Sequence, residues 1–200
     1  MGIIWVHPGD RRLAESGAAN ANVDLAAWRA GCRIRSYKCD WREVILISIR
    51  KATTEDAGDI LACLAAAFAE YRESYSPGAF RDTVLTAETI AERLREMTLF
   101  VATGESGKVV GTIACAVVSE HEGHIRGMAV VPESQGSGIA RRLLMQAEAY
   151  FRERNCTRIS LDTTTPLKRA ILLYEKFGFS PSGKVQDFFG MPLMEYIKAV

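Results

Sequence analysis

The stretch Met128-Ala-Val-Val-Pro-Glu-Ser-Gln-Gly-Ser-Gly-Ile-Ala-Arg141 decides the fold, because two closely spaced glycines join an apolar strand to a helix. The strand ends at Pro132, since proline cannot donate a ladder hydrogen bond. Gly136 and Gly138 let the backbone approach a ligand closely. A helix N-terminus adds unpaired N–H donors and about half a positive charge. The stretch therefore predicts a pyrophosphate cradle, with a plain tight turn as the alternative.

The glycine spacing argues against the common nucleotide-binding loops. It matches neither G-x-x-x-x-G-K-[ST], which cradles nucleoside triphosphates, nor G-x-G-x-x-G, which binds dinucleotides. A nucleotide-binding α/β domain is therefore a disfavoured reading of this segment.

Hydrophobic periodicity and turn residues predict the elements on either side of this stretch. The strand at 125–131 is followed by a helix at 137–154, a strand at 158–162, a helix at 166–177 closed by Gly178, and two strands within 183–198. It is preceded by a strand at 44–50, a helix from Thr54 to about Tyr71, a loop at 72–85, a helix capped by Thr86, and a hairpin of strands 99–103 and 109–118. The order βααβββαβαββ predicts an α/β fold with a mixed sheet.

The first 44 residues differ from the remainder. They hold all three tryptophans, Trp5, Trp28 and Trp41, without a sustained strand or helix period. We expect 1–44 to be an N-terminal extension, poorly ordered in one interpretation, and 45–200 to form the domain. A small regulatory module and a mis-assigned start codon are the alternatives for the extension.

Charge and cysteine content restrict the partners. A net charge of +1 and a pI of about 7.6 argue against bulk nucleic-acid binding. The five cysteines are odd in number and lack a C-x-x-C pair, which argues against a disulfide framework and a zinc site, so no metal is expected. Cys115 lies in an apolar run, and we expect a packing role rather than a nucleophile.

The chain shows no sign of a membrane or secretory segment. No stretch approaches 18 uninterrupted apolar residues, and no basic segment precedes an apolar core at the N-terminus. We therefore expect a cytoplasmic protein with no membrane partner.

Two motifs carry a family resemblance. Gln135-x-x-Gly138-x-Ala140 resembles the Q/R-x-x-G-x-G/A acyl-CoA signature of the GNAT N-acyltransferase superfamily. Leu173-Tyr-Glu-Lys-Phe-Gly-Phe179 resembles that family's L-Y-x-x-x-G-F helix end. The resemblance covers 45–200. It departs at Leu167, where many members have asparagine, and a threonine hydroxyl or Lys168 could replace that contact.

The resemblance implies an N-acetyltransferase that moves an acetyl group from acetyl-CoA to a primary amine of a small molecule or peptide by direct attack in a ternary complex. It implies that strands 109–118 and 125–131 splay apart and hold the pantetheine arm. The implied CoA-binding residues are Met128, Ala129, Val130, Gln135, Gly136, Ser137, Gly138, Ile139, Ala140 and Arg141. Transfer of a longer acyl group and a non-catalytic acetyl-CoA-binding regulatory module are the alternatives.

The resemblance also implies catalytic roles. Tyr174 is the expected acid for the CoA thiolate, with a core tyrosine as the alternative. His124 and Glu122 are the candidate bases, and the alternative is a polar turn around Gly123 with water as the base. The acceptor is expected over the 70–85 and 188–192 segments, where Glu70, Glu73 and Asp82 could attract a cationic amine and aromatic residues could form walls. These aromatic residues are Tyr71, Tyr75, Phe80, Phe188 and Phe189. Edge strands in 183–198 make a homodimer plausible.

Overall fold

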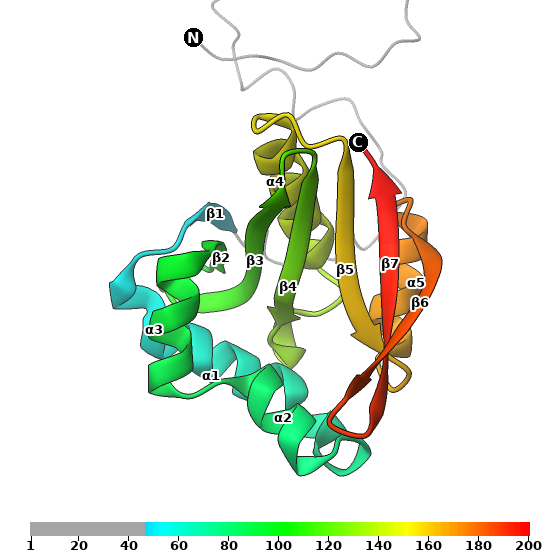
Figure 1. Cartoon of the computed structure of the whole chain (residues 1–200). Helices are drawn as coiled ribbons and strands as arrows, with labels where there is room; N and C mark the ends of the chain where they lie inside the picture. The colour runs from blue at the N-terminus through cyan, green and yellow to red at the C-terminus, as the bar shows by residue number, and fades with distance from the viewer. Residues whose placement is uncertain (1–46) are drawn as a thin grey trace, which may run out of the picture. The chain divides into compact units, whose positions relative to one another are not determined.

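A computed structural model of the chain describes residues 47–200 (Figure 1). The predicted extension at 1–44 lies outside the described residues. So do residues 44–46 of the first predicted strand.

Seven strands form one mixed sheet in the order β1-β2-β3-β4-β5-β7-β6. Only β4 and β5 pair in parallel, and the other neighbours are antiparallel. The mixed sheet predicted from the element order is therefore confirmed. The strands are β1 Ser48–Lys51, β2 Thr98–Thr103, β3 Val109–Ser119, β4 Glu122–Val130, β5 Arg158–Thr164, β6 Ser180–Phe188 and β7 Met191–Ala199.

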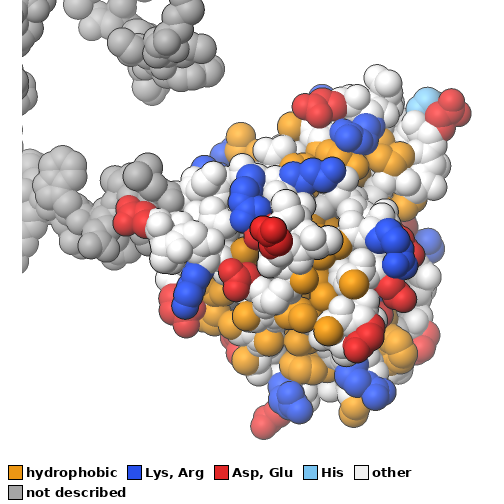
Figure 2. All heavy atoms as spheres, turned by 90° about the vertical axis from the view of Figure 1, so that its left-hand side faces the viewer, with side chains coloured by type: hydrophobic (Ala, Val, Ile, Leu, Met, Phe, Trp, Pro, Cys, Tyr) orange, Lys and Arg blue, Asp and Glu red, His pale blue; other side chains and the backbone are white. Residues whose placement is uncertain are grey.

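Five α-helices of the described part of the chain cover the two faces of the sheet. They are α1 Ala57–Phe68, α2 Pro77–Val84, α3 Ala87–Glu96, α4 Ile139–Arg152 and α5 Lys168–Lys176. Figure 1 shows α4 and α5 behind the sheet, with α2 and α3 on the viewer's side. One buried cluster joins α4 and α5 to the sheet, and a second joins α1, α2 and α3 to its other face. On the face seen in Figure 2, acidic and basic side chains are interspersed rather than segregated by sign.

The segment 72–85 differs from its predicted loop. It contains the end of a 3-10 helix, Ala69–Ser74, and all of α2. The Ser76 hydroxyl accepts a hydrogen bond from the Ala79 N–H, 3.3 Å, and Pro77 occupies the first turn. A serine cap followed by proline is a helix-start signal, so the predicted loop at 72–85 is wrong.

The predicted splay between strands 109–118 and 125–131 is wrong. These segments, β3 and β4, pair from Gly111↔Val130 to Ser119↔Glu122. The separation instead occurs between β4 and β5, which pair only from Glu122↔Arg158 to Ile125↔Leu161. A hairpin keeps β3 and β4 together, whereas β5 arrives through a crossover helix and diverges from β4 after four residue pairs.

A β-bulge re-aims β4 at the point of divergence. The register shifts between Thr112 and Ala114, so that two β4 residues, Gly127 and Met128, oppose one residue of β3. Gly127 has a φ of +61°, which glycine adopts without a Cβ penalty. The bulge therefore sets the direction of the Met128–Val130 segment.

Gly123 lies inside β4, so the predicted turn at residues 121–124 is also wrong. The turn is at Glu120–His121, ahead of the strand. Gly123 is needed for close packing, because a Cβ on it would lie 2.2 Å from Cδ1 of Phe151 in α4. As a result, Glu122 and His124 are both strand residues.

Candidate active site

Two cavities meet in the middle of the domain. The larger, of about 680 Å³, lies among the end of β4, the start of α4, and helices α1 and α5. The smaller, of about 260 Å³, lies beside the diverging parts of β4 and β5. Both are lined by Phe68, Met128, Leu167 and Tyr174. A ligand in one cavity could therefore contact a ligand in the other beside these four residues.

The start of α4 supplies open donors to the larger cavity. Within residues 47–200, the backbone N–H groups from Gly136 to Arg141 make no hydrogen bond, and the first helical bond joins the Arg142 N–H to the Gly138 carbonyl, 3.1 Å. Gly136 and Gly138 have φ angles of +78° and +84°, and no atom lies within 4 Å of a Cβ built on either. Open N–H groups beside an unobstructed backbone fit an anionic group.

Side chains hold this loop in place. Nε2 of Gln135 donates to the Val130 carbonyl, 3.1 Å, and the Ser137 hydroxyl donates to the Ser134 carbonyl, 2.5 Å. Gln135 therefore ties the loop to the end of β4. Arg141 lines the cavity, and its guanidinium donates a hydrogen bond to the Met145 sulfur, 3.5 Å.

Along β4, Met128, Ala129 and Val130 line the larger cavity. Beyond Ile125 this strand has no partner in β5. Its edge toward β5 is therefore available to an extended ligand, in the way that a peptide adds to a sheet edge. The predicted CoA-binding residues of β4 and of the α4 loop are thus gathered around one cavity, apart from Ser137, which supplies a neighbouring backbone N–H.

Tyr174 of α5 lies where the two cavities meet. Its side chain is buried, with its ring edge-on to Phe179 at a centroid distance of 6.0 Å. Its hydroxyl makes no hydrogen bond to any residue in the described range 47–200. Burial raises the pKa of Tyr174 above its usual value, and the neighbouring Tyr75 adds to the rise. The phenol therefore stays protonated at neutral pH and has a proton available for a ligand.

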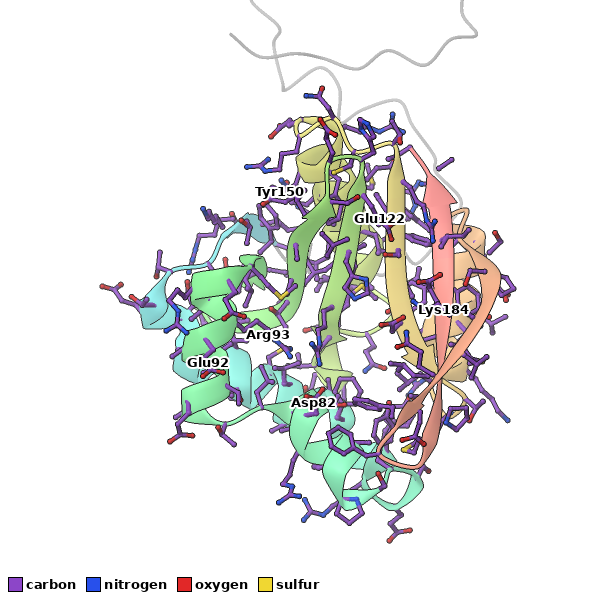
Figure 3. The ribbon with its side chains drawn as sticks, in the orientation of Figure 1. Asp82, Glu92, Arg93, Glu122, Tyr150 and Lys184 are labelled. Carbon is purple, nitrogen blue, oxygen red and sulfur yellow. The ribbon has the colours of Figure 1, made fainter. Side chains whose placement is uncertain are left out.

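His124 belongs to a polar network across the parallel β4–β5 contact. Its Nδ1 lies 3.1 Å from the Ser160 hydroxyl, and its Nε2 lies 3.7 Å from Oδ2 of Asp162. The Ser160 hydroxyl donates to Oε1 of Glu122, 2.7 Å. Burial lowers the pKa of His124, and the Asp162 carboxylate opposes that effect. The lowered pKa keeps the imidazole neutral at pH 7, so it can accept a proton. Figure 3 shows Glu122 on β4 at this contact.

Sequence reasoning identified Glu122 and His124 but missed Ser160 and Asp162. Strand alternation predicts that residues 160 and 162 share one face of β5. The sequence does not show that this face lies beside His124, because that depends on the β4–β5 register, which pairs His124 with Ser160. His124 and Asp162 both line the smaller cavity.

The predicted acceptor-binding residues do not all lie at one cavity. Asp82, Tyr75 and Phe188 line the smaller cavity, while Tyr71 lines the larger one. Glu70 pairs with Arg169 of α5. The remaining predicted residues, Glu73, Phe80 and Phe189, do not line either cavity.

Two arginines that sequence reasoning did not assign also line the smaller cavity. Arg93 comes from α3 and Arg126 from β4, and Arg126 is paired with Asp82 of α2 at 2.7 Å. Thr163 of β5 lines the same cavity, and its hydroxyl is the one buried side-chain polar atom in the described part of the chain without a hydrogen bond. From the sequence, a threonine hydroxyl could replace the contact that many family members make with an asparagine at the position of Leu167, and Thr163 is one of the threonines that precede Leu167.

The described cysteines are packing residues. Cys63, Cys115 and Cys156 are buried and free, and burial raises the pKa of Cys63 and Cys115 to about 12. The prediction that Cys115 packs in the core is confirmed. Between residues 47 and 200, no group of three or more His, Cys, Asp or Glu side chains could hold a metal ion. No helix in that range is long and apolar enough to cross a membrane.

Comparison with known proteins gives a consistent result. The family model described as "Acetyltransferase (GNAT) family" matches residues 60–179. The chain is 27% identical over 154 residues to aminoglycoside N(6')-acetyltransferase type 1 of Stenotrophomonas maltophilia, covering 73% of this chain and 94% of that protein. Ten further curated proteins also match this chain, and one of them, N-alpha-acetyltransferase MAK3 of Arabidopsis thaliana, is 29% identical over 86 residues, covering 42% of this chain and 45% of that protein.

Solved structures share the fold. A GNAT-family acetyltransferase of Staphylococcus aureus Mu50 superposes with a TM-score of 0.64 and 17% identity, covering 76% of this chain and 98% of that one. The PaiA N-acetyltransferase of Thermoplasma acidophilum in complex with coenzyme A gives 0.62 and 19%, covering 77% and 99%. The family model covers more than half of the 200 residues and includes both sequence motifs. The chain therefore belongs to the acetyltransferase (GNAT) family.

Proposed function

We propose that the protein transfers an acetyl group from acetyl-CoA to a primary amine of a small molecule or peptide, by direct attack in a ternary complex. One observation carries the proposal: the unpaired N–H groups of Gly136–Arg141 lie at a cavity that Tyr174 also lines. Tyr174 lines the second cavity as well, together with His124. A donor site and an acceptor site therefore share one proton donor.

The cosubstrate would be held by backbone groups. The diphosphate of CoA carries the negative charge that the start of α4 attracts, and Arg141 at the same cavity adds a positive charge. The amides of the pantetheine arm would pair with the free edge of β4 at Met128–Val130. That geometry leads from the loop toward Tyr174, which also lines this cavity.

The reaction needs one bond formed and one broken. The nitrogen lone pair of a neutral amine attacks the thioester carbonyl carbon, and the C–S bond then breaks to release the CoA thiolate. A backbone N–H of the Met128–Val130 segment would stabilise the oxyanion that develops between these events. No acyl-enzyme is required, which agrees with the raised pKa of the buried Cys115 thiol.

His124 and Tyr174 would carry the two protons. The amine loses one proton to the neutral imidazole of His124, directly or through water, and the Asp162 carboxylate stabilises the imidazolium. Glu122 acts on His124 through the Ser160 hydroxyl, so we assign it as a positioning residue rather than a second base.

Tyr174 would donate the other proton to the departing thiolate. A phenol with a raised pKa is a weak acid toward a thiolate in water, but burial raises thiol pKa values too, as for Cys63 at about 12. A thiolate released beside the buried phenol would meet the same desolvation. The raised pKa of the phenol therefore does not by itself disfavour proton transfer to the thiolate.

A screen of primary amines with acetyl-CoA and a free-thiol readout tests the proposal. The panel contains amino acids, polyamines, an aminoglycoside and short peptides, and it is repeated with propionyl-CoA and succinyl-CoA, because the diphosphate seat contacts only the CoA part. Amine-dependent thiol release supports transfer. Heat of CoA binding by calorimetry without turnover of any amine would favour the regulatory-module alternative, and absence of both contradicts the acyl-CoA site.

The boundary at residue 45, the homodimer and the cytoplasmic location remain predictions.

A further inference from the structure

The smaller cavity has an unbalanced positive charge on its α3 side. Arg93 is partly buried and lines this cavity, and its guanidinium makes no hydrogen bond or ion pair with any residue from 47 to 200. The Asp82 carboxylate, whose charge acts on Arg93, already pairs with Arg126 at 2.7 Å. Two arginines and one aspartate therefore leave one cationic charge without a partner at the cavity wall.

Arg93 is held in this position by the strand that it faces. Its Nη1 would lie 2.9 Å from a Cβ built on Gly127, so the guanidinium packs against the bulge of β4. Figure 3 shows Arg93 on α3 and Asp82 on α2, on the same side of the sheet. Burial and repulsion from Arg126 together lower the pKa of Arg93 to about 10, and the Asp82 carboxylate opposes both effects. The side chain still carries its charge at neutral pH, in surroundings that disfavour that charge.

A second part of the cavity lining carries a negative charge. Asp162 and His124 belong to it, from β5 and β4, 3.7 Å apart. A ligand spanning the two parts would place an anion against Arg93 and an amine against the His124–Asp162 pair. The cavity of about 260 Å³ is below the range of about 300–1,000 Å³ that is typical for drug-sized ligands, so the ligand is small.

We infer that the acceptor is a small amine that carries a carboxylate, of the free amino acid type, with the carboxylate bound by Arg93. This inference rests on the proposed function and specifies the substrate class of its acceptor cavity. An unpaired guanidinium is the donor best suited to a carboxylate, because it can form two parallel hydrogen bonds. The same charge repels a polycation, so polyamines and aminoglycosides are poor acceptors for this chain.

Matched acceptors test the inference. Each L-amino acid that is acetylated is compared with its own carboxamide, which keeps the side chain and the α-amine but lacks the negative charge. Amidation also changes the basicity of the amine. The decisive quantity is therefore the acid-to-amide ratio of kcat/KM in the natural protein divided by that ratio in Arg93→Gln. We expect this quotient to be about 10 to 100, the effect of losing hydrogen bonds to a charged group.

Two further variants separate charge recognition from folding. Arg95→Gln removes an exposed arginine of the same helix, paired only with Glu96 at 4.0 Å, and should leave the acid-to-amide ratio unchanged. Arg93→Lys should retain part of the preference, because the charge remains while the paired donors are lost. CoA binding by calorimetry checks that each variant keeps its donor site.

The outcomes distinguish the inference from the function on which it rests. A quotient near 1, or faster turnover of spermidine than of any amino acid, overturns the carboxylate assignment and leaves the N-acetyltransferase proposal standing. CoA binding without turnover of any amine overturns both the assignment and catalysis, but leaves the CoA site intact. A protein that does not bind CoA contradicts the proposed function itself.

Discussion

Nε2 of His124 lies 3.7 Å from Oδ2 of Asp162, across the last part of the sheet where β4 and β5 are still paired. One residue pair further, the strands separate and the smaller cavity begins. The position matters because the imidazole is supported by the sheet on one side and open to a ligand on the other. The strand pairing therefore fixes the position of His124, and the Asp162 carboxylate acts on its charge.

This relationship predicts the pH dependence of the reaction. Burial lowers the pKa of His124 below 6.5, so kcat/KM should be constant at neutral pH and fall as the pH drops through that lowered value, because the protonated imidazole cannot accept a proton. Asp162→Asn removes a charge that raises this pKa, so the acidic limb should move to lower pH. The measurement is the pH profile of kcat/KM.

His124→Gln should abolish the acidic limb and lower turnover about 10²- to 10⁴-fold. The matched control is His121→Gln, at the exposed turn before β4, which should keep both the limb and the rate. If His124→Gln retains the natural profile, proton transfer proceeds through water and His124 is a structural residue.

Tyr174→Phe should lower kcat by about 10²- to 10⁴-fold and leave the dissociation constant of CoA within a few-fold of its natural value. The change removes one hydroxyl and keeps the ring contact with Phe179. Tyr196→Phe is the matched control, because that buried phenol bonds to Glu175 rather than lining a cavity. Single-turnover kinetics and calorimetry measure the two quantities, and equal kcat values for Tyr174→Phe and the natural protein would remove Tyr174 as the acid.

Much of this arrangement followed from local sequence. The cap at Thr86, the closing glycine Gly178, the β-hairpins and the apolar face of α4 depend on residues a few positions apart, and so they were predicted correctly. The Thr86 hydroxyl, for example, accepts from the Thr89 N–H at the start of α3. The start of the first helix at Thr54 was wrong, because Thr54–Asp56 form a 3-10 turn and α1 begins at Ala57. The GNAT motifs likewise lie within short segments, so the residues around the larger cavity were found without a structure.

Features set by long-range pairing were not predicted. The divergence of β4 from β5 depends on a register between residues 36 positions apart, as in His124↔Ser160, and the resemblance alone led to the wrong pair of strands. Gly123 was assigned to a turn because the sequence alone does not show what lies next to it. The Phe151 ring of α4 occupies the space that a Cβ on Gly123 would take, and this packing explains the glycine. Arg93 was not assigned for a related reason, since only tertiary packing brings it to the bulge of β4.

The α4 loop gives a test of the anion seat. Gly138→Asp would place a carboxylate beside the open N–H groups and should weaken CoA binding by at least about 100-fold through repulsion and occupied space. An aspartate at a φ of +84° is also strained. Gly107→Asp introduces the same residue at a φ of +77° in the β2–β3 turn, with no atom near the new Cβ. That control should lose comparable stability but retain CoA affinity, as measured by calorimetry; unchanged affinity in Gly138→Asp would contradict the seat.

The contact between Gly123 and Phe151 should be sensitive to a single methyl group. Gly123→Ala puts a Cβ 2.2 Å from the Phe151 ring, and overpacking of this kind costs about 1–3 kcal/mol of the free energy of unfolding. Because His124 is the next residue, the strain should also lower turnover. Denaturant titration measures the first effect and the thiol assay the second.

Phe151→Leu in the Gly123→Ala background should recover part of the lost stability, because the smaller side chain vacates that space. Gly58→Ala in α1, where no atom lies within 4 Å of the new Cβ, should instead stabilise the domain by about 0.5–1 kcal/mol. A Gly123→Ala protein as stable as the natural one would mean that β4 and α4 can separate at this point, and the fixed position of His124 would then need another cause.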